Sequence, residues 1–420
     1  MSKELFVGID TDLDSLTNCF LNNSGDILVN PFDLSNTLPD AQKLESKIDS
    51  VMQQHNLDKL LIGTEATNFY DYHIIDFLAN SPVLNKYSPQ LYRFNPNIIK
   101  GFKKSYPDSD KTDPNDSFVI ADRLRFGHLP ASYNSEKQFL PLRRLTRYRF
   151  HLAQSIVREK NYFLAHLFLK FSAIAQNNPF SNTFGNTSLS IIEEFLSVDD
   201  IVNAHLDQLI DFILEHSKNK LSQSEAQKIS QLLKYAARES YRLRPALDKS
   251  VNLILATSIS NIRTLSSTIK KIDKTISEEV KAFNNTLITV DGIGPVYSSG
   301  ILAEIGDIRR FPNESKIAKL AGLAWKKFQS GKFIAVETRM LRCANKYLRY
   351  YLIEAANSLR VHNEDYRNFY QKKFQEVSKH KHKRAIALTA RKFVRLVFAL
   401  LSKKQIYSPD FSLNRRSNVT

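Results

Sequence analysis

Cysteine is scarce in this sequence of 420 residues, which contains only Cys19 and Cys343. Two cysteines so far apart exclude a cysteine-rich zinc site and give no hint of a disulfide framework. Long apolar runs are missing too, since no stretch approaches the ~20 residues that span a bilayer. The opening MSKELFVGID lacks a signal-peptide pattern, because a strand-like segment starts almost at once. We therefore expect a cytoplasmic protein without a membrane partner.

Acidic residues are in the minority. The chain has 43 Asp and Glu against 59 Lys and Arg, which leaves a formal charge of +16. Such an excess favours a polyanionic partner, most simply nucleic acid. A hydrophobic content of 42% allows sizeable cores. The length suggests two or three domains.

The first part of the chain alternates the signals of strands and helices. In ELFVGID (residues 4–10), large apolar residues at odd positions alternate with Phe6, Gly8 and Asp10 at even positions, which is typical of a strand. Two further short strands follow, and a buried strand ends near Glu65 after a helical stretch. We expect an α/β domain over residues 1–130, with strands first and helices interspersed.

Residues 131–283 are predicted to be helical, and the long helix that begins LRRLTRYRF is studded with arginine. In the last of these helices, apolar residues recur every three or four positions, at Leu255, Ile259, Ile262, Leu265, Ile269, Ile272, Ile276 and Val280. This spacing predicts a coiled-coil-like seam. The alternative is a helix packed on the core of its own domain. Residues 284–408 are expected to form a compact, mostly helical domain, and residues 409–420 a tail.

Four carboxylates lie at positions that suit chemistry. Asp10 and Glu65 each end a predicted strand, whereas Asp113 and Asp116 stand three apart in the first turn of a predicted helix. Taken alone, Asp-Pro-x-Asp is a good helix start in which the acids serve only as caps. Together, the four acids offer the oxygen ligands that two Mg²⁺ ions ~3.5–4 Å apart need for phosphoryl transfer. Decoys or supporting candidates are Asp12, Asp14, Asp110 and Asp122.

Basic residues and a glycine-rich turn suit contacts with nucleic acid. In DGIGPVYSSGILAEIG, Gly292 and Gly294 form a helix-hairpin-helix-like turn whose backbone N–H groups suit a DNA phosphate. The alternative is a sharp turn between two helices. The predicted phosphate-contacting cations are Arg143, Arg147, Lys326, Lys327, Lys332, Arg339 and Arg349.

Several segments, in order, resemble the DEDD-type insertion-sequence transposases. These are relatives of pilin-gene invertases and are understood as bridge-RNA-guided serine recombinases. The similar segments are FVGIDT, IGTEAT, RFNPNIIKGFKKSYPDSDKTDPND, LRRLTRYRFHLAQSIVREKN, DGIGPVYSSGILAEIGDIRRFPNESKIAKLAGLAW, QSGK and RCANKYLRYYLIEAA. The chain departs from the family pattern at Ser117, where many members carry alanine, and at residues 333–335, often rich in glycine and arginine.

The resemblance implies a RuvC-like domain with the RNase H fold, whose metal-binding DEDD set is Asp10, Glu65, Asp113 and Asp116. It also implies that Ser330, in QSGK, is the nucleophile. No His-Asp pair lies near this serine in sequence, and without the resemblance a turn serine is the simpler interpretation.

The implied protein is a bacterial transposase, nucleoid-associated when bound to DNA. The resemblance implies that it acts on donor and target DNA, uses two Mg²⁺ ions and is guided by a noncoding bridge RNA. Its coiled coil assembles dimers, and then tetramers on DNA. Two other classes stay open: a RuvC-like Holliday-junction nuclease that uses water, and a non-catalytic nucleic-acid-binding protein.

Overall fold

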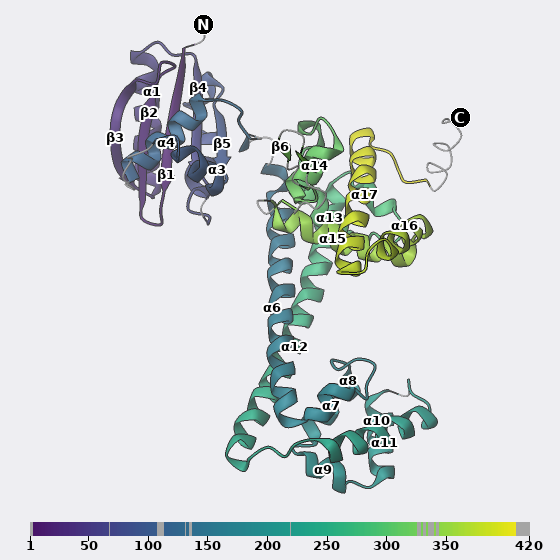
Figure 1. Cartoon of the computed structure of the whole chain (residues 1–420). Helices are drawn as coiled ribbons and strands as arrows, with labels where there is room; N and C mark the ends of the chain where they lie inside the picture. The colour runs from purple at the N-terminus through teal and green to yellow at the C-terminus, as the bar shows by residue number, and fades with distance from the viewer. Residues whose placement is uncertain are drawn as a thin grey trace, which may run out of the picture. The chain divides into compact units, whose positions relative to one another are not determined.

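The computed structural model describes most of the chain. The described residues are 3–66, 68–106, 113–130, 132–133, 137–218, 220–325, 329–330, 333–334, 340–341 and 344–408. They divide into a first unit, residues 1–141 with 305–312, and a second unit, residues 142–304 with 313–420 (Figure 1). The boundaries that the sequence predicts, at 130/131 and 283/284, stay predictions. Among the described residues, no helix is both long and apolar enough to cross a membrane.

The first unit is built on one mixed sheet in the order β3-β2-β1-β4-β5. Its strands are β1 (Glu4–Thr11), β2 (Ser15–Leu21), β3 (Ile27–Ser35), β4 (Lys59–Glu65) and β5 (Gln90–Phe94). The first three strands pair antiparallel, and β4 and β5 continue the sheet in parallel with β1. This mixed α/β arrangement agrees with the predicted RuvC-like domain.

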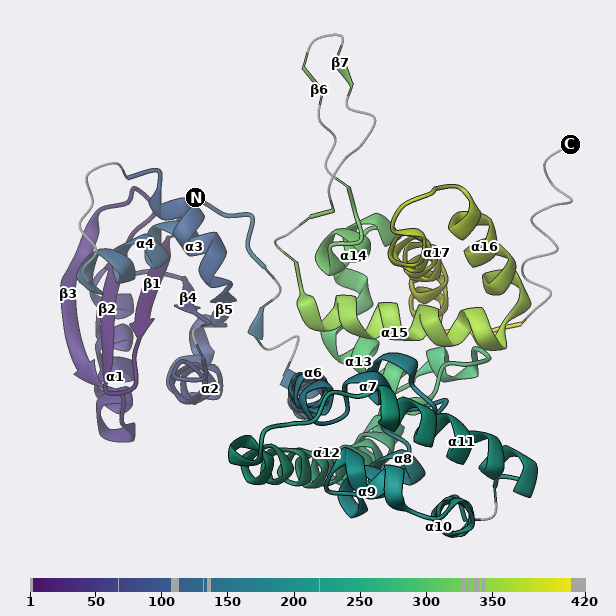
Figure 2. The same ribbon diagram turned by 60° about the horizontal axis from the view of Figure 1, so that its bottom comes forward.

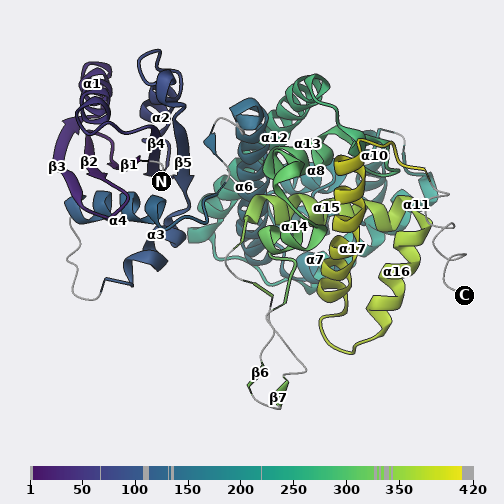
Figure 3. The same ribbon diagram turned by 90° about the horizontal axis from the view of Figure 1, so that it is seen from above.

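Helices cover both faces of this sheet, as Figure 3 shows from above. The helices are α1 (Leu38–Gln54), α2 (Tyr72–Ala79), α3 (Pro96–Lys103) and α4 (Asp113–Arg125), with a short 3₁₀ helix η1 (Asn85–Tyr87). Leu5, Val7 and Ile9 pack in a core with α1 and α2, whereas Phe6 packs with α3 and α4 on the other face. The predicted alternation along β1 is therefore confirmed, and the even positions, including Asp10, belong to the face that α4 covers.

Gly8 lets α4 lie directly on β1. A Cβ atom at this position would stand 2.1 Å from the carbonyl oxygen of Ser117 and 2.5 Å from the backbone nitrogen of Ala121. Real Cβ atoms do not approach backbone so closely, and the backbone of a packed helix cannot yield as a flexible side chain does. Glycine is therefore required in the strand that ends at Asp10.

Gly8→Ala is expected to destabilise the first unit by at least about 2 kcal/mol, because the added methyl group pushes α4 off the sheet. Thermal unfolding of the purified chain checks this. Gly101→Ala is the matched control, since a Cβ at Gly101 meets nothing within 4 Å and alanine suits a helix better than glycine. Equal melting temperatures for the Gly8 variant and the wild type would contradict the close approach of α4 to β1.

Two long helices of the second unit run antiparallel and side by side (Figure 1). They are α6 (Leu140–Lys170) and α12 (Pro245–Glu279), and Arg149 of α6 forms an ion pair with Asp273 of α12. Five shorter helices pack around the end of α6 and the beginning of α12. They are α7 (Ser172–Asn177), α8 (Asn186–Glu194), α9 (Val198–Asn203), α10 (Leu206–His216) and α11 (Gln223–Glu239).

The predicted apolar seam on α12 is buried in its first part, half-buried in its second part and buried again at Ile276. Leu255, Ile259 and Ile262 are buried in the core that α7–α11 form, so this part packs within its own domain, as the alternative interpretation held. Leu265 and Ile269, further along the helix, are only half-buried. Pairing of this second part with another copy stays a prediction.

The carboxy-terminal part of the second unit is mostly helical. Its elements are α13 (Pro295–Ile305), α14 (Glu314–Ala321), β6 (Gln329–Ser330), β7 (Phe333–Ile334), α15 (Lys346–His362), α16 (Glu364–Gln375) and α17 (Lys381–Lys403). Short 3₁₀ helices join the elements: η2 (Lys137–Phe139), η3 (Val280–Ala282), η4 (Thr286–Thr289) and η5 (Ile308–Arg310). Helices α15, α16 and α17 pack against one another (Figure 2). The hydroxyl group of Tyr351 donates a hydrogen bond of 2.6 Å to the carbonyl oxygen of Thr146, which ties α15 to α6.

Candidate active site

Asp10 and Glu65 stand at the same edge of the sheet. Strands β1 and β4 are parallel neighbours, and their register pairs Ile9 with Thr64. The carboxyl ends of the two strands therefore lie side by side. Leu61 is four residues before Glu65 and therefore on the same face of β4, and it packs in the core under α4. Both carboxylates thus belong to the face that α4 covers.

Helix α4 brings the other two carboxylates to this edge. Gly8 faces Ser117, and both Asp113 and Asp116 lie in the first turn of α4. From Gly8 to Asp10 the strand advances about 7 Å, and from Ser117 back to Asp113 the helix recedes about 6 Å. The start of α4 therefore meets the end of β1.

The other three acids lie close enough to Asp10 to act on its charge. Burial, and then the charges of Asp116, Asp113 and Glu65, together raise the pKa of the Asp10 carboxyl to about 6. Each of the three carboxylates acts on Asp10 through space because like charges disfavour its ionised form. The sequence predicts that these four acids converge on metal, and their role as metal ligands stays a prediction.

Oxygen ligands and uncompensated negative charge fit a hard divalent cation such as Mg²⁺. The arrangement is not that of a finished metal site, however. Across the described ranges, no three side chains of Asp, Glu, His or Cys are placed to hold one ion. The Nζ atom of Lys103, at the end of α3, instead forms an ion pair with Asp116, and both side chains are mostly buried.

The end of β4 is fixed by a buried ion pair that the sequence did not reveal. Asp71 is completely buried and accepts hydrogen bonds from the guanidinium group of Arg93. The hydroxyl group of Thr64 donates to the same carboxylate at 3.2 Å. Because Thr64 directly precedes Glu65, this network holds the backbone that carries Glu65. Arg93 and Lys103 both lie within RFNPNIIKGFKK. The only sequence signal for them is that this segment lies between Glu65 and Asp113 in the chain.

The other acids named from the sequence have separate roles. Asp122 lies in the last turn of α4, where its carboxylate accepts hydrogen bonds from Tyr106 and Arg125. Asp12 accepts a hydrogen bond from the backbone N–H of Leu13 at 2.8 Å. Asp110 lies outside the described residues. Ser117, the departure from the family pattern, is buried, and its hydroxyl group donates to the carbonyl oxygen of Pro114 at 2.9 Å.

Ser330 belongs to the second unit. Its backbone lies in β6 and pairs with Phe333 of β7, so the serine stands at the end of a short antiparallel hairpin. Four of the predicted phosphate-contacting residues lie outside the described residues: Lys326, Lys327, Lys332 and Arg339. Ala335, part of the second departure from the family pattern, lies outside them as well.

Arg143 and Arg147 of α6 bind within the second unit. The guanidinium group of Arg147 forms two hydrogen bonds with the carboxylate of Glu304, at 2.6 and 2.8 Å, and the Glu304 side chain is only 1% exposed. Arg143 donates to the carbonyl oxygen of Ala303 at 2.7 Å. Asn345 donates to the same Glu304 carboxylate at 2.6 Å. These arginines therefore join α6 to α13, and their contact with nucleic acid stays a prediction.

Arg349 has a similar internal role. It donates to the carbonyl oxygens of Ala321 and Leu341 at 2.9 and 2.8 Å. Gly322, with φ of +68°, ends α14 beside this guanidinium group. Arg349 therefore fastens the chain on both sides of the segment that carries Ser330, and its contact with nucleic acid likewise stays a prediction.

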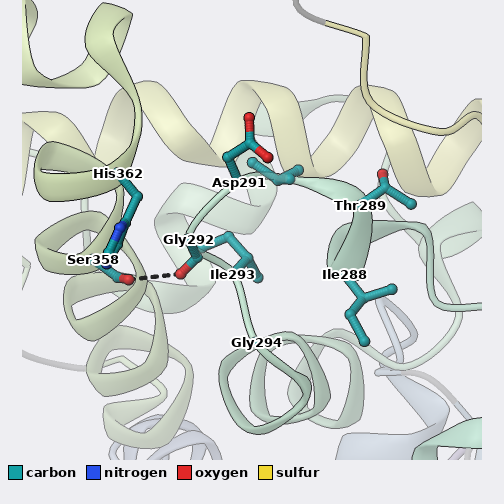
Figure 4. Close-up of a pocket in the computed structure, with 9 residues that line it drawn as sticks. Ile288, Thr289, Asp291, Gly292, Ile293, Gly294, Ser358 and His362 are labelled. Atoms are coloured by element: carbon teal, nitrogen blue, oxygen red, sulfur yellow. Dashed lines mark hydrogen bonds between the residues drawn. The ribbon is translucent and has the colours of Figure 1, made fainter.

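Gly292 and Gly294 form the predicted turn before α13. Gly292 has φ of +86°, a left-handed conformation that favours glycine, and its carbonyl oxygen accepts a hydrogen bond of 2.6 Å from Ser358. Residues 288–294, Ser358 and His362 line an open cavity of about 510 Å³ (Figure 4). The turn is thus present and accessible, and phosphate binding there stays a prediction.

Comparison with known families matches both ends of the chain. Residues 7–171 match the transposase model of the DEDD type from IS110, and residues 284–371 match the transposase IS116/IS110/IS902 family. The protein is therefore a transposase, an enzyme that cuts and rejoins DNA. The similarity to the transposases of the IS116/IS110/IS902 type covers residues 7–171 and residues 284–371.

Two relatives align with the chain over most of their length. The insertion element IS900 uncharacterized 42 kDa protein of Mycobacterium paratuberculosis is 24% identical over 311 residues, which are 73% of this chain and 75% of the relative. The insertion element IS116 uncharacterized 44.8 kDa protein of Streptomyces clavuligerus is 24% identical over 308 residues, 73% of this chain and 74% of the relative. Both relatives come from insertion elements.

Proposed function

We propose that this transposase cuts and rejoins DNA strands through a covalent bond to Ser330, with the help of divalent cations held by its four clustered carboxylates. The observation that carries the proposal is the closeness of these acids: burial, and then the charges of Asp116, Asp113 and Glu65, raise the pKa of Asp10 to about 6. If the acids only capped separate helices and strands, they would not need to lie close enough to repel one another. A site that concentrates negative charge beside a DNA phosphate requires cations.

Asp10, Glu65, Asp113 and Asp116 would hold one or two Mg²⁺ ions. When bound, such ions neutralise charge on the phosphate and stabilise the departing oxygen. The protein's own contribution is to position these oxygens. Gly8 seats α4 on β1, and the buried pair of Asp71 and Arg93 fixes the strand end before Glu65.

The covalent step exchanges one phosphorus–oxygen bond for another. The Oγ atom of Ser330 attacks a DNA phosphorus atom and loses its proton, while one phosphorus–oxygen bond of the backbone breaks and the departing deoxyribose oxygen gains a proton. The strand is held as a phosphoserine ester until the hydroxyl group of a new partner strand attacks the same phosphorus atom and releases the serine. Such covalent catalysis divides one difficult step into two easier ones.

The partners follow from charge and from family resemblance. A formal charge of +16 suits donor and target DNA, together with a noncoding bridge RNA that pairs with both. The half-buried part of the α12 seam, with Leu265 and Ile269, is the proposed contact for dimers and for tetramers on DNA.

Trapping the covalent intermediate tests this function. The purified protein is incubated with Mg²⁺, the RNA transcribed from beside its gene and a DNA substrate nicked near the element end, so that the cut strand diffuses away. We expect a protein–DNA adduct that survives denaturation, and mass spectrometry of the digested adduct should place the phosphate on Ser330. Cleaved DNA with no adduct at any time point would instead indicate hydrolysis by water.

A further inference from the structure

Lys103 is presented to the acidic cluster by a well-packed helix. Asn95 caps α3 by accepting a hydrogen bond of 2.9 Å from the backbone N–H of Asn97, and Ile99 is buried. The ring of Phe102 packs at 5.6 Å from that of Phe126, which follows α4. Helix α3 is therefore fixed on α4, and the Lys103 side chain that ends it reaches Asp116.

The pair of Lys103 and Asp116 is more enclosed than an ordinary surface ion pair. The two side chains are 22% and 23% exposed, so water screens their attraction less than it does at a free surface. Asp116 is also the largest charged contributor to the raised pKa of Asp10. The ammonium group is therefore paired with the carboxylate whose charge acts most strongly on Asp10.

This contact conflicts with use of Asp116 as a metal ligand. A carboxylate oxygen that accepts a hydrogen bond from an ammonium group is less available to a cation, and a lysine Nζ adjacent to bound Mg²⁺ would be repelled by it. The described acids are close together, yet no three of them are placed to hold one ion. The Lys103 ammonium group occupies one of the four carboxylates and offsets part of the negative charge of the cluster.

We propose that Lys103 is a built-in counterion that competes with the divalent cation for Asp116 and is released toward the DNA phosphate when the cation binds. The proposal rests on the proposed function, because it assumes that the four carboxylates hold metal. Lysine suits this role because its charge is compact and its stem is flexible. The released ammonium group stays within a side-chain length of the site and can neutralise an incoming phosphate.

Divalent-metal affinity tests the competition directly, without DNA. The apparent dissociation constant for Mn²⁺ is measured by calorimetry on the full-length protein. Lys103→Met is expected to bind Mn²⁺ about five- to tenfold more tightly than the wild type, because a competing cation is gone. Lys103→Arg keeps the charge and should stay near the wild type. Lys104→Met, which removes the next, exposed lysine, is the matched control, expected to change affinity by less than about twofold.

A second readout tests the release toward DNA. At saturating Mg²⁺, Lys103→Met should cleave DNA more slowly than the wild type although it binds metal more tightly. A purely structural lysine would not move the two quantities in opposite directions. If Lys103→Met fails to fold, as judged by melting in EDTA, Lys103→Gln replaces it, because glutamine retains a hydrogen-bond donor without the charge.

The outcomes separate this inference from the proposed function. Asp10→Asn should weaken Mn²⁺ binding in either case. If it does, but Lys103→Met and Lys104→Met bind Mn²⁺ equally, competition by Lys103 is wrong and the metal site stands. If Mn²⁺ binding is absent from the wild type, or is unchanged in Asp10→Asn, the proposed metal site itself fails, and the inference fails with it.

Discussion

Ser330→Ala is expected to abolish strand exchange and the covalent adduct, with a loss of at least about 10³-fold in rate. The reason is chemical, since alanine has no oxygen to attack phosphorus. DNA binding should persist, because phosphate contacts come from cations and backbone N–H groups rather than from this hydroxyl group. Recombination between donor and target plasmids, together with a gel-shift assay, measures both properties.

Two further variants make the serine experiment specific. Ser250→Ala removes an exposed hydroxyl group whose hydrogen bond, to the carbonyl oxygen of Leu247, lies within α12, and it should recombine DNA like the wild type. Ser330→Cys keeps a nucleophile of similar shape and should retain weak adduct formation. Should Ser330→Ala still nick DNA at the wild-type rate, the enzyme uses water, as a RuvC-like junction nuclease does.

The sequence predicts where each acid lies on its own strand or helix, because this depends on short-range patterns. Alternation in ELFVGID assigns Asp10 to one face of a strand, and a spacing of three puts Asp113 and Asp116 in one helical turn. Gly8 is also visible in sequence, although its role requires knowing which helix lies above it. The family resemblance supplied the remaining link, which is that these segments meet.

Contacts between segments far apart in the chain could not be predicted in this way. Arg147 looks like a cation for DNA until Glu304, 157 residues away, is seen to accept two hydrogen bonds from it. Lys103 looks like one of several surface lysines until it meets Asp116. A charged residue carries no sign in the sequence of whether its partner is solvent, DNA or another side chain, because that depends on packing. The helices α7–α11 lie between the two family matches and have no such guide.

Asp10→Asn is expected to lower metal-dependent DNA cleavage by at least about 10²-fold and, without metal, to stabilise the protein. The pKa of Asp10 is raised from 3.8 to about 6 in the folded state. Folding therefore favours the protonated carboxyl. Below about pH 4, Asp10 is protonated in both the folded and the unfolded state, so its carboxyl does not lower the free energy of unfolding. As the pH rises from about 4 to 6, the wild type loses stability, and above pH 6 the whole penalty is present.

The neutral amide of Asp10→Asn escapes this penalty, so the variant should gain about 1–2 kcal/mol at pH 7, after allowance for solvent screening of a half-exposed group. Melting in EDTA at pH 4 and pH 7 measures the difference, which should grow with pH. Asp113→Asn discriminates further: helix capping predicts that it loses stability at pH 7, whereas repulsion within the cluster predicts a gain. If both variants melt below the wild type and still cleave DNA, the acids are caps, and a chain that binds DNA without cutting it through these residues explains them better.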